Sequence, residues 1–324
     1  MTHRPQLLLA AWLLALAPVL HAQASAPAAP ATPPPSASGA AWTDGAGVDI
    51  EVRANVVYRT ASGQELKLDL FLPAGRHRGT PPPLLINIHG GGWVAGNKEA
   101  AVLRLLPYLQ RGWAAANVQY RLGPVALAPA AVEDVRCALR FATARAKEWG
   151  FDASRIVLSG GSAGGHLALM VGMLPDGHRF DRACATEGRE RWTSGVEPPL
   201  RVVAVVNWFG ITDVADLLAG ANAKHYAIEW FGSQPDAERA ALAREVSPLH
   251  HVRAGGPAVF TVHGTADDLV PYAHAERLHQ ALARAGVRHE LMTVPEGGHG
   301  FGRAVVEQAH QRLFQFLQPL LQRP

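Results

Sequence analysis

The chain has 324 residues, of which 48% are hydrophobic and 18% are charged, a composition typical of a globular protein. Its 30 basic and 27 acidic residues give a formal net charge of +3, and no run of basic residues stands out, so nucleic-acid binding is disfavoured because it requires clustered positive charge. The length suits one large α/β domain or two small ones.

The N-terminus has the parts of an export signal. Basic residues precede the apolar run Leu7–Leu20, which is too short to span a bilayer comfortably, and the small residues Ala22 and Ala24 match the A-x-A pattern of a signal-peptidase site. The alternative is a buried N-terminal helix, which would not require this order of charge, apolar core and cleavage motif. We therefore predict that residues 1–24 are a signal peptide, that the mature protein is secreted or periplasmic, and that it has no membrane span.

A linker and one domain are expected to follow. Residues 25–46 are rich in alanine, proline and serine, with three consecutive prolines from Pro33 to Pro35, as is typical of an extended linker. The rest of the sequence shows no internal repeat and no second domain. Residues 47–324 are therefore predicted to form one domain.

Strands are predicted along the whole of this domain. Ile50–Tyr58 and Glu65–Leu72 flank a turn at residues 61–63 and are expected to pair antiparallel. Short apolar runs with little alternation follow, as expected for strands covered on both faces of a parallel sheet. These runs are Leu84–Ile88, Ala114–Val118, Ile156–Leu158, Val202–Val206 and Ala258–Val262. A last strand is predicted at Glu290–Val294.

Helices are predicted between the later strands. Apolar residues at spacings of three and four predict a helix over residues 132–146 with its C-terminal cap at Gly150, and another over residues 275–285. A final helix is expected over residues 304–317. Alternating strands and helices after an antiparallel start predict an α/β fold with a doubly wound, mostly parallel sheet.

Two connections are longer than ordinary loops. Residues 175–199 and 212–248 are predicted to be small insertions that cap the sheet edge. The first holds Cys184, and the other cysteine of the chain, Cys137, lies in a predicted helix, so no CxxC metal or redox motif exists. Because an exported protein matures in an oxidising compartment, we predict a disulfide rather than two free thiols.

The stretch Gly160–Gly164 reads G-x-S-x-G and lies between a predicted strand and an apolar helix. In such a strand-to-helix turn the serine adopts an uncommon backbone conformation and its Oγ stands clear of the sheet, and the flanking glycines leave room for the turn. A phosphate-binding loop is excluded, because the Walker lysine and the G-x-G-x-x-G spacing are absent. Ser162 is therefore the predicted nucleophile.

A serine nucleophile requires a base that a third group orients. Among 15 histidines, His299 lies in a glycine-flanked loop after the last predicted strand, whereas His166 lies one helical turn after Ser162 and is expected to be buried. The acid in this topology comes between serine and histidine, where Asp267 and Asp268 follow a predicted strand.

An oxyanion formed by attack on a carbonyl requires preorganised N–H donors. Ala163, directly after the nucleophile, supplies one such donor. The glycines of "HGGGW", residues 89–93, can supply others, because residues without a Cβ let the backbone approach a substrate closely.

Together these stretches resemble the α/β-hydrolase serine esterases, and most closely the secreted acetyl-xylan and feruloyl esterase-like group related to the hormone-sensitive-lipase-like esterases. The resemblance extends from about Val48 to Leu317. It is carried by the stretches "HGGGW", "VQYRLGP", "GGSAGGHLAL", "VNWFGITD", "HGTADDLVP" and "GGHGF".

The resemblance implies roles for individual residues. The pattern H-G-x-x-D-x-x-V-P places the acid at Asp267, and the base falls on His299. The implied oxyanion donors are Gly91, Gly92 and Ala163, and the implied pocket-wall residues are Trp93, Tyr120 and Trp208. Residues 47–324 are then the α/β-hydrolase catalytic domain.

The expected activity is hydrolysis of carboxylic esters through a Ser-His-Asp triad and an acyl-enzyme, without metal or organic cofactor. The expected substrates are small-molecule or carbohydrate esters with short-chain acyl, acetyl or feruloyl groups. Two alternatives remain: an exopeptidase, because serine peptidases use the same fold and triad, and a non-catalytic binding module that keeps the fold.

Overall fold

The structure is a computed structural model and describes residues 49–76, 79–184, 199–233 and 235–322. All of these belong to one compact unit that begins at Ala40. The predicted signal peptide and linker, residues 1–24 and 25–46, lie outside the described residues.

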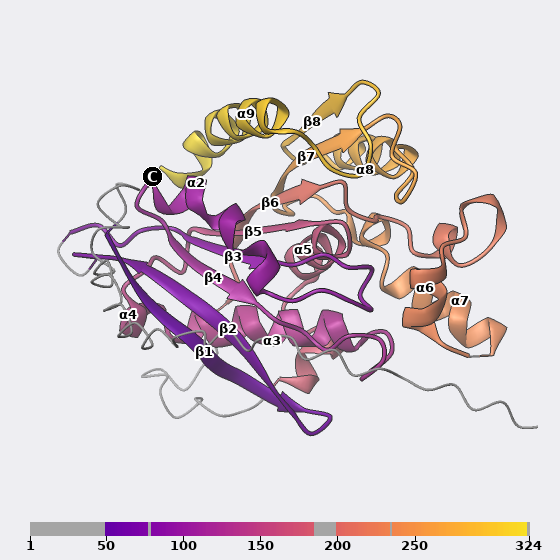
Figure 1. Cartoon of the computed structure of the whole chain (residues 1–324), viewed down its shortest axis with the longest axis horizontal. Coiled ribbons are helices and arrows are strands. Elements are labelled where there is room, and N and C mark those ends of the chain that lie inside the picture. The colour runs from indigo at the N-terminus through magenta and orange to yellow at the C-terminus, as the bar shows by residue number, and fades with distance from the viewer. Residues whose placement is uncertain (1–48, 77–78, 185–198, 234, 323–324) are drawn as a thin grey trace, which may run out of the picture. The chain divides into compact units, whose positions relative to one another are not determined.

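The described strands form one mixed sheet in the order β1-β2-β4-β3-β5-β6-β7-β8 (Figure 1). Their bounds are β1 (Ile50–Ala61), β2 (Gln64–Pro73), β3 (Leu84–Ile88), β4 (Ala114–Val118), β5 (Ile156–Gly161), β6 (Val202–Trp208), β7 (Ala258–Gly264) and β8 (His289–Val294). β2 pairs antiparallel with β1 and β4, and the remaining pairs are parallel. The predicted mostly parallel sheet with an antiparallel start is confirmed.

Three parallel strands extend beyond their predicted ends. The predictions for β5, β6 and β7 stopped where the apolar run stopped, but each ladder continues through buried polar residues. In β6 and β7, for example, Asn207 Nδ2 donates to Thr261 Oγ1 at 3.3 Å, and both residues are fully buried. A polar residue is tolerated in the middle of a sheet when its hydrogen bond is satisfied there.

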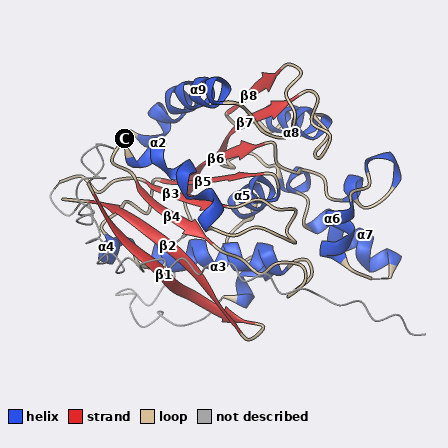
Figure 2. Cartoon of the chain, viewed as in Figure 1, coloured by secondary structure: helices blue, strands red, loops and turns tan. Residues whose placement is uncertain are grey.

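Helices cover both faces of the sheet (Figure 2). The α-helices are α2 (Leu106–Leu109), α3 (Ala130–Ala144), α4 (Ala146–Trp149), α5 (Ala163–Met173), α6 (His225–Phe231), α7 (Asp236–Glu245), α8 (Ala273–Arg284) and α9 (Arg303–Leu321). The 3-10 helices are η1 (Glu99–Leu105), η2 (Arg179–Ala183), η4 (Ala215–Leu217), η5 (Gly220–Asn222) and η6 (Pro248–His251).

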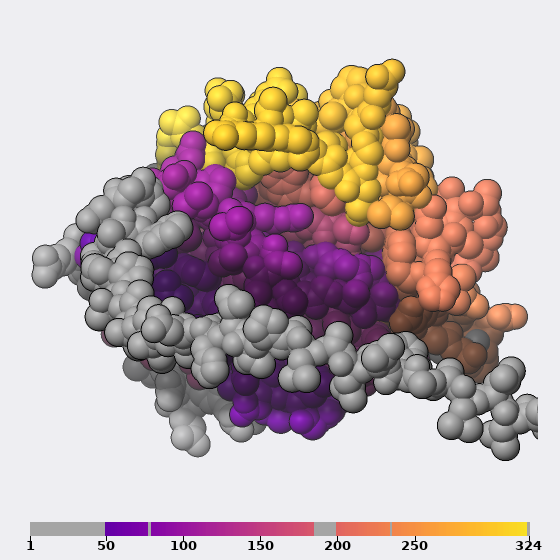
Figure 3. All heavy atoms as spheres, in the orientation of Figure 1, coloured from indigo at the N-terminus to yellow at the C-terminus, as the bar shows by residue number. Residues whose placement is uncertain are grey.

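Each face has its own hydrophobic core. Buried residues of α3, α5 and α8 pack in the first core, and those of α2 and α9 pack in the second. The surfaces of α9 and of the η1–α2 segment adjoin in Figure 3, and the rings of Tyr108 and His310 lie 6.0 Å apart between them. The predicted doubly wound arrangement is therefore confirmed.

The helix predicted over residues 132–146 is two helices. α3 ends at Ala144, because Arg145 departs from helical geometry with φ −104° and ψ 7°. The short α4 follows, and Gly150 caps it at φ 75°, a left-handed conformation that glycine adopts without strain. The predicted cap is therefore confirmed at Gly150, but it ends α4 rather than α3.

The first predicted insertion is bound to α3 by a disulfide and an ion pair. The predicted bridge between Cys137 and Cys184 is confirmed. One residue before Cys137, the buried Arg136 forms a two-point ion pair with Asp181 of η2, with N–O distances of 2.6 and 2.9 Å. Residues 185–198 of this insertion lie outside the described residues.

The second insertion, residues 212–248, forms η4, η5, α6 and α7. α6 lies beside the loop that follows β7, because Tyr226 Oη donates to the backbone oxygen of Leu269 at 2.9 Å and Lys224 Nζ to that of Asp268 at 2.7 Å. Within the described ranges, no helix combines the length and the apolar character that crossing a membrane requires.

Candidate active site

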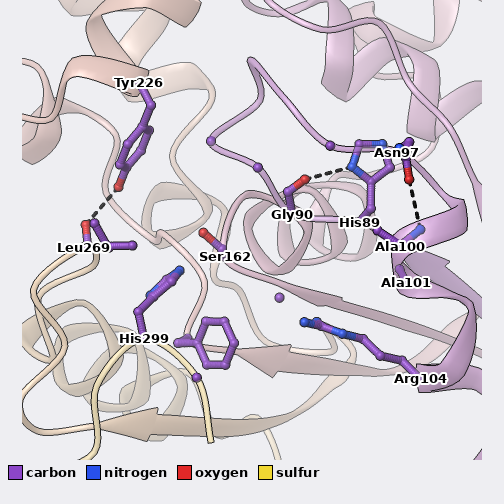
Figure 4. A pocket seen from close by; sticks show the side chains of 16 residues that line it. His89, Gly90, Asn97, Ala100, Ala101, Arg104, Ser162, Tyr226, Leu269 and His299 are labelled. Carbon is purple, nitrogen blue, oxygen red and sulfur yellow. Dashed lines mark hydrogen bonds between the residues drawn. The ribbon is translucent and has the colours of Figure 1, made fainter. Parts of the chain in front are cut away.

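A cavity of about 540 Å³ at the carboxyl ends of the parallel strands is lined by four of the predicted site residues, Gly91, Gly92, Ser162 and His299 (Figure 4). Its walls come from the loop after β3, the turn between β5 and α5, α6, and the loops after β7 and β8. Ligands of open parallel sheets bind at this edge, where loops from several strands converge.

The turn between β5 and α5 holds Ser162 in an uncommon backbone conformation, with φ 57° and ψ −125°. The turn is crowded: a Cβ on Gly160 would collide with the backbone of Gly164, and a Cβ on Gly164 would collide with the carbonyl oxygen of Ile88. Ser162 N donates to the backbone oxygen of Trp208 at 2.9 Å, which fixes the turn against β6. Glycines at both positions are thus required to hold the serine at positive φ.

His299 and Asp267 form a hydrogen-bonded pair. His299 Nδ1 lies 2.8 Å from Oδ2 and 3.0 Å from Oδ1 of the buried Asp267 carboxylate. With Nδ1–H donating to the carboxylate, the unprotonated Nε2 of His299 is free to accept a proton. Asp268, the other candidate for the acid, is exposed, and its backbone oxygen accepts a hydrogen bond from Lys224 Nζ.

The Asp267 carboxylate accepts several further hydrogen bonds. Backbone N–H groups of Leu269 and Val270 donate to Oδ1 at 3.0 and 2.9 Å, and His263 Nε2 lies 3.3 Å from Oδ2. Burial alone would raise the pKa of Asp267, but the hydrogen bonds from the two histidines and Val270 outweigh it and hold that pKa well below its ordinary value. Asp267 is therefore an anion whose orientation is fixed from several sides.

Ser162 and His299 line the same cavity, and Figure 4 shows both side chains directed into it. Within the described part of the chain, no hydrogen bond joins the serine hydroxyl to the imidazole. Such contacts are commonly long in the absence of a substrate and shorten when the reacting complex forms.

Backbone N–H groups of the cavity are available to bind a ligand. Gly91 and Gly92 have φ values of 116° and 60°, and their N–H groups and that of Ala163 have no hydrogen-bond acceptor among the described residues. The Gly91 carbonyl is engaged elsewhere, because it accepts from Val94 N and Ala95 N at 3.1 and 2.9 Å. Unpaired donors in a cavity can bind an oxyanion.

Residues 68–282 match the BD-FAE family. The chain belongs to this family. It is 32% identical over 216 residues to the probable carboxylic ester hydrolase LipM of Mycobacterium tuberculosis, an alignment that covers 64% of this chain and 48% of LipM. The chain spans about half the length of the curated relatives it matches.

Solved esterases share the fold of this BD-FAE chain. A truncated carbohydrate esterase from gut microbiota is 27% identical with a TM-score of 0.68, over 83% of this chain and 96% of that one. The thermophilic esterase Est2 of the planctomycete Thermogutta terrifontis, with propionate bound, is 27% identical with a TM-score of 0.67, over 85% and 95% of the two chains. The fold is that of the α/β-hydrolase esterases.

The alternative base, His166, lies outside the cavity of this BD-FAE site. It is fully buried, with Trp93 Nε1 donating to its Nδ1 at 3.0 Å and its Nε2 2.6 Å from the backbone oxygen of Val246. Burial lowers the pKa of His166 to about 3, so the ring is neutral. With both ring nitrogens hydrogen-bonded inside the protein, His166 has none left for Ser162.

The three aromatic residues that the resemblance placed on the pocket wall lie elsewhere. Trp93 is fully buried and stacks on Trp230 with ring centroids 4.3 Å apart. Tyr120 stacks on His89 at 4.2 Å behind the glycine loop, and its hydroxyl donates to the His89 backbone oxygen. Trp208 lines a neighbouring cavity of about 350 Å³. None of the three is among the described residues that line the larger cavity: the rings of Trp93 and Tyr120 are buried beneath the loops, and Trp208 faces the neighbouring cavity.

The cavity wall includes side chains that the sequence analysis did not single out. Tyr226 reaches it from α6, Phe209 packs against His299 with ring centroids 4.6 Å apart, and Arg104 reaches it from η1. No motif marks these positions, since their approach to Ser162 depends on how the insertion and η1 fold. Among the described residues, no group of histidine, cysteine and carboxylate side chains is arranged to hold a metal ion.

Proposed function

We propose that this protein hydrolyses carboxylic esters through an acyl-enzyme on Ser162. The observation that carries the proposal is the hydrogen bond between His299 Nδ1 and the buried Asp267 carboxylate, with the His299 side chain lining the same cavity as Ser162. Names of relatives that contain "esterase" or "carboxylic ester hydrolase" support the same reaction class.

In the proposed reaction His299 Nε2 removes the Ser162 proton as Oγ attacks the ester carbonyl. The charge that develops on the carbonyl oxygen is stabilised by the N–H groups of Gly91, Gly92 and Ala163. His299 then protonates the leaving alcohol, and a water molecule activated by the same imidazole releases the acid. Asp267 holds the His299 tautomer and stabilises the imidazolium throughout.

The substrates we propose are small-molecule or carbohydrate esters with short-chain, acetyl or feruloyl acyl groups. The cavity of about 540 Å³ is within the usual size range of small-molecule sites. We also propose that the protein acts outside the cytoplasm, as the N-terminal pattern indicates, and the disulfide between Cys137 and Cys184 supports an oxidising compartment.

The test is a panel of matched esters and amides assayed with the wild type and with Ser162→Ala, together with labelling by a fluorophosphonate. We expect ester hydrolysis and labelling in the wild type and loss of both in a folded Ser162→Ala variant, with kcat reduced by about three orders of magnitude or more. Preferential cleavage of N-terminal amides would support the exopeptidase instead. Absence of both hydrolysis and labelling would support the binding module.

A further inference from the structure

We propose that Arg104 binds a carboxylate carried by the substrate, so that the Ser162 site prefers esters with a negative charge near the scissile bond. This inference rests on the proposed ester hydrolysis and narrows its substrate class. It follows from the position of the Arg104 guanidinium and from the absence of a carboxylate beside it among the described residues.

Arg104 lies in η1, directly beside the nucleophile turn. Its side chain lines the same cavity as Ser162 and His299, and Figure 4 shows the guanidinium extending into that space. A Cβ built on Gly161 would lie 2.5 Å from Arg104 Nη1, so the guanidinium packs against the residue that precedes Ser162. A substrate acylating Ser162 would therefore lie within reach of this charge.

The charge of Arg104 has no protein partner in the part of the chain that the structure describes. Neither the larger cavity nor the neighbouring one of about 350 Å³, which Arg104 also lines, has an aspartate or glutamate among its described lining residues. Surrounding protein desolvates the guanidinium and lowers the pKa of Arg104, yet arginine stays protonated at neutral pH. Water in the cavity reaches the side chain, so a ligand can reach it too.

Two buried arginines elsewhere in the protein are paired with carboxylates. Arg121 contacts Asp134 at 2.8 Å, and Arg136 contacts Asp181 at 2.6 Å. Both pairs offset the cost of removing a charge from water with charge-assisted hydrogen bonds. Arg104 differs in that it stays exposed in the cavity and has no carboxylate beside it among the described lining residues, so a bound ligand can supply one.

A carboxylate is the anion that best fits both the guanidinium and the proposed reaction. The planar guanidinium presents parallel N–H donors that match the two oxygens of a carboxylate. Apolar rings of Trp208, Phe209 and Phe301 line the neighbouring cavity, so the carbon chain bearing the carboxylate has an apolar surface to contact. The carboxylate could belong to the acyl group or to the alcohol, and the two arms of the experiment distinguish these sources.

The test compares charged and neutral esters of the same shape. The acyl arm compares the para-nitrophenyl monoester of adipic acid with the para-nitrophenyl ester of adipamic acid, in which an amide replaces the free carboxylate. The alcohol arm compares para-acetoxybenzoate with para-acetoxybenzamide. Each is assayed with the wild type, Arg104→Met, Arg104→Lys and a control, Arg284→Met. Arg284 is exposed at the end of α8 and lines neither cavity, so its substitution removes the same charge elsewhere.

In at least one arm we expect the wild type to prefer the carboxylate ester, and Arg104→Met to lower the ratio of kcat/KM values, charged over neutral, by about tenfold. Arg104→Lys should keep part of the preference, because it keeps the charge but loses the planar pair of donors. The Arg104→Lys variant also keeps the test decisive if Arg104→Met folds poorly. Arg284→Met should leave the ratio unchanged.

Two negative outcomes are distinguishable. Hydrolysis of the neutral esters with a charged-to-neutral ratio that Arg104→Met and Arg104→Lys do not alter would overturn this inference and leave the proposed function standing. If none of the four esters is hydrolysed and a fluorophosphonate does not label Ser162, the proposed function is overturned and this inference with it.

Discussion

The indole Nε1–H of Trp93 donates a hydrogen bond to Nδ1 of His166 across 3.0 Å, with both side chains fully buried. Trp93 ends the glycine loop at φ 64°, a conformation that costs free energy for a residue with a side chain. The bond therefore fastens this loop to α5. His166 thus has a structural role next to the site rather than a chemical role within it.

We expect His166→Ala to destabilise the protein by about 3 kcal/mol, because it leaves a cavity and two unpaired polar groups, the Trp93 indole and the Val246 carbonyl. Urea unfolding measures this loss. In the fraction that folds, kcat should stay within about tenfold of the wild type, whereas His299→Ala should lose about three orders of magnitude or more with little change in stability. An active His299→Ala beside a folded, inactive His166→Ala would reverse the two assignments.

Acid should destabilise the fold through its buried histidines. Burial lowers the pKa of His166 and of His279 to about 3 and that of His274 to about 4, from an ordinary value of 6.5. Below pH 6.5 the unfolded chain therefore binds protons that the folded chain does not, and the free energy of unfolding falls by about 1.4 kcal/mol per pH unit for each group. The loss starts near pH 6.5 and continues until the folded-state pKa is passed.

A substitution at His279 tests whether buried histidines cause this loss of stability in acid. In the native protein His279 Nδ1 lies 2.9 Å from His289 Nδ1. His279→Gln removes one titrating ring and introduces an amide that can still hydrogen-bond to His289. We expect the slope of unfolding free energy against pH between pH 6 and 4 to flatten by about 1.4 kcal/mol per unit. The control is His225→Gln, since the side chain of His225 is 93% exposed. Equal slopes in the two variants would show that burial of His279 does not drive the acid sensitivity.

The disulfide should contribute stability without affecting catalysis. Cys137 and Cys184 are 47 residues apart in the sequence, so the bridge restricts a long loop in the unfolded chain. Replacing both with alanine should lower the free energy of unfolding by about 2–4 kcal/mol. The ester-hydrolysis kcat should stay within about twofold, because neither cysteine lines the larger cavity. Mass spectrometry of unreduced peptides checks the bridge itself, and alkylation of both thiols in the native protein would contradict it.

The sequence predicted those parts of the fold that depend on local pattern. Apolar runs located the parallel strands, and G-x-S-x-G located a serine at positive φ between strand and helix. The break at Arg145 was missed because apolar spacing continues across it, and spacing carries no information about the backbone angles of one residue.

The missed cavity residues share another cause. Tyr226 enters the wall because α6 folds back so that a Cβ on Gly92 would lie 2.8 Å from the Cβ of Tyr226, an approach set by tertiary packing rather than by any motif. Conversely, Trp93 and Tyr120 flank functional motifs in the sequence but pack beneath them. Proximity to a motif in sequence therefore predicted the backbone of the site better than its side-chain walls.

Asp267 and Asp268 provide the sharpest test of the site, because they are adjacent, chemically identical and differently placed. Asp267 is buried against His299, while Asp268 is exposed. Asp267→Asn should lower kcat by about two to four orders of magnitude, since an amide can favour the wrong His299 tautomer and cannot stabilise the imidazolium. Asp268→Asn is the matched control and should change kcat less than about tenfold, because its contact with Lys224 uses the backbone oxygen. Both variants are assayed on one activated ester, with melting curves to confirm folding. An inactive, folded Asp268→Asn beside an active Asp267→Asn would move the acid by one residue and refute the pairing with His299.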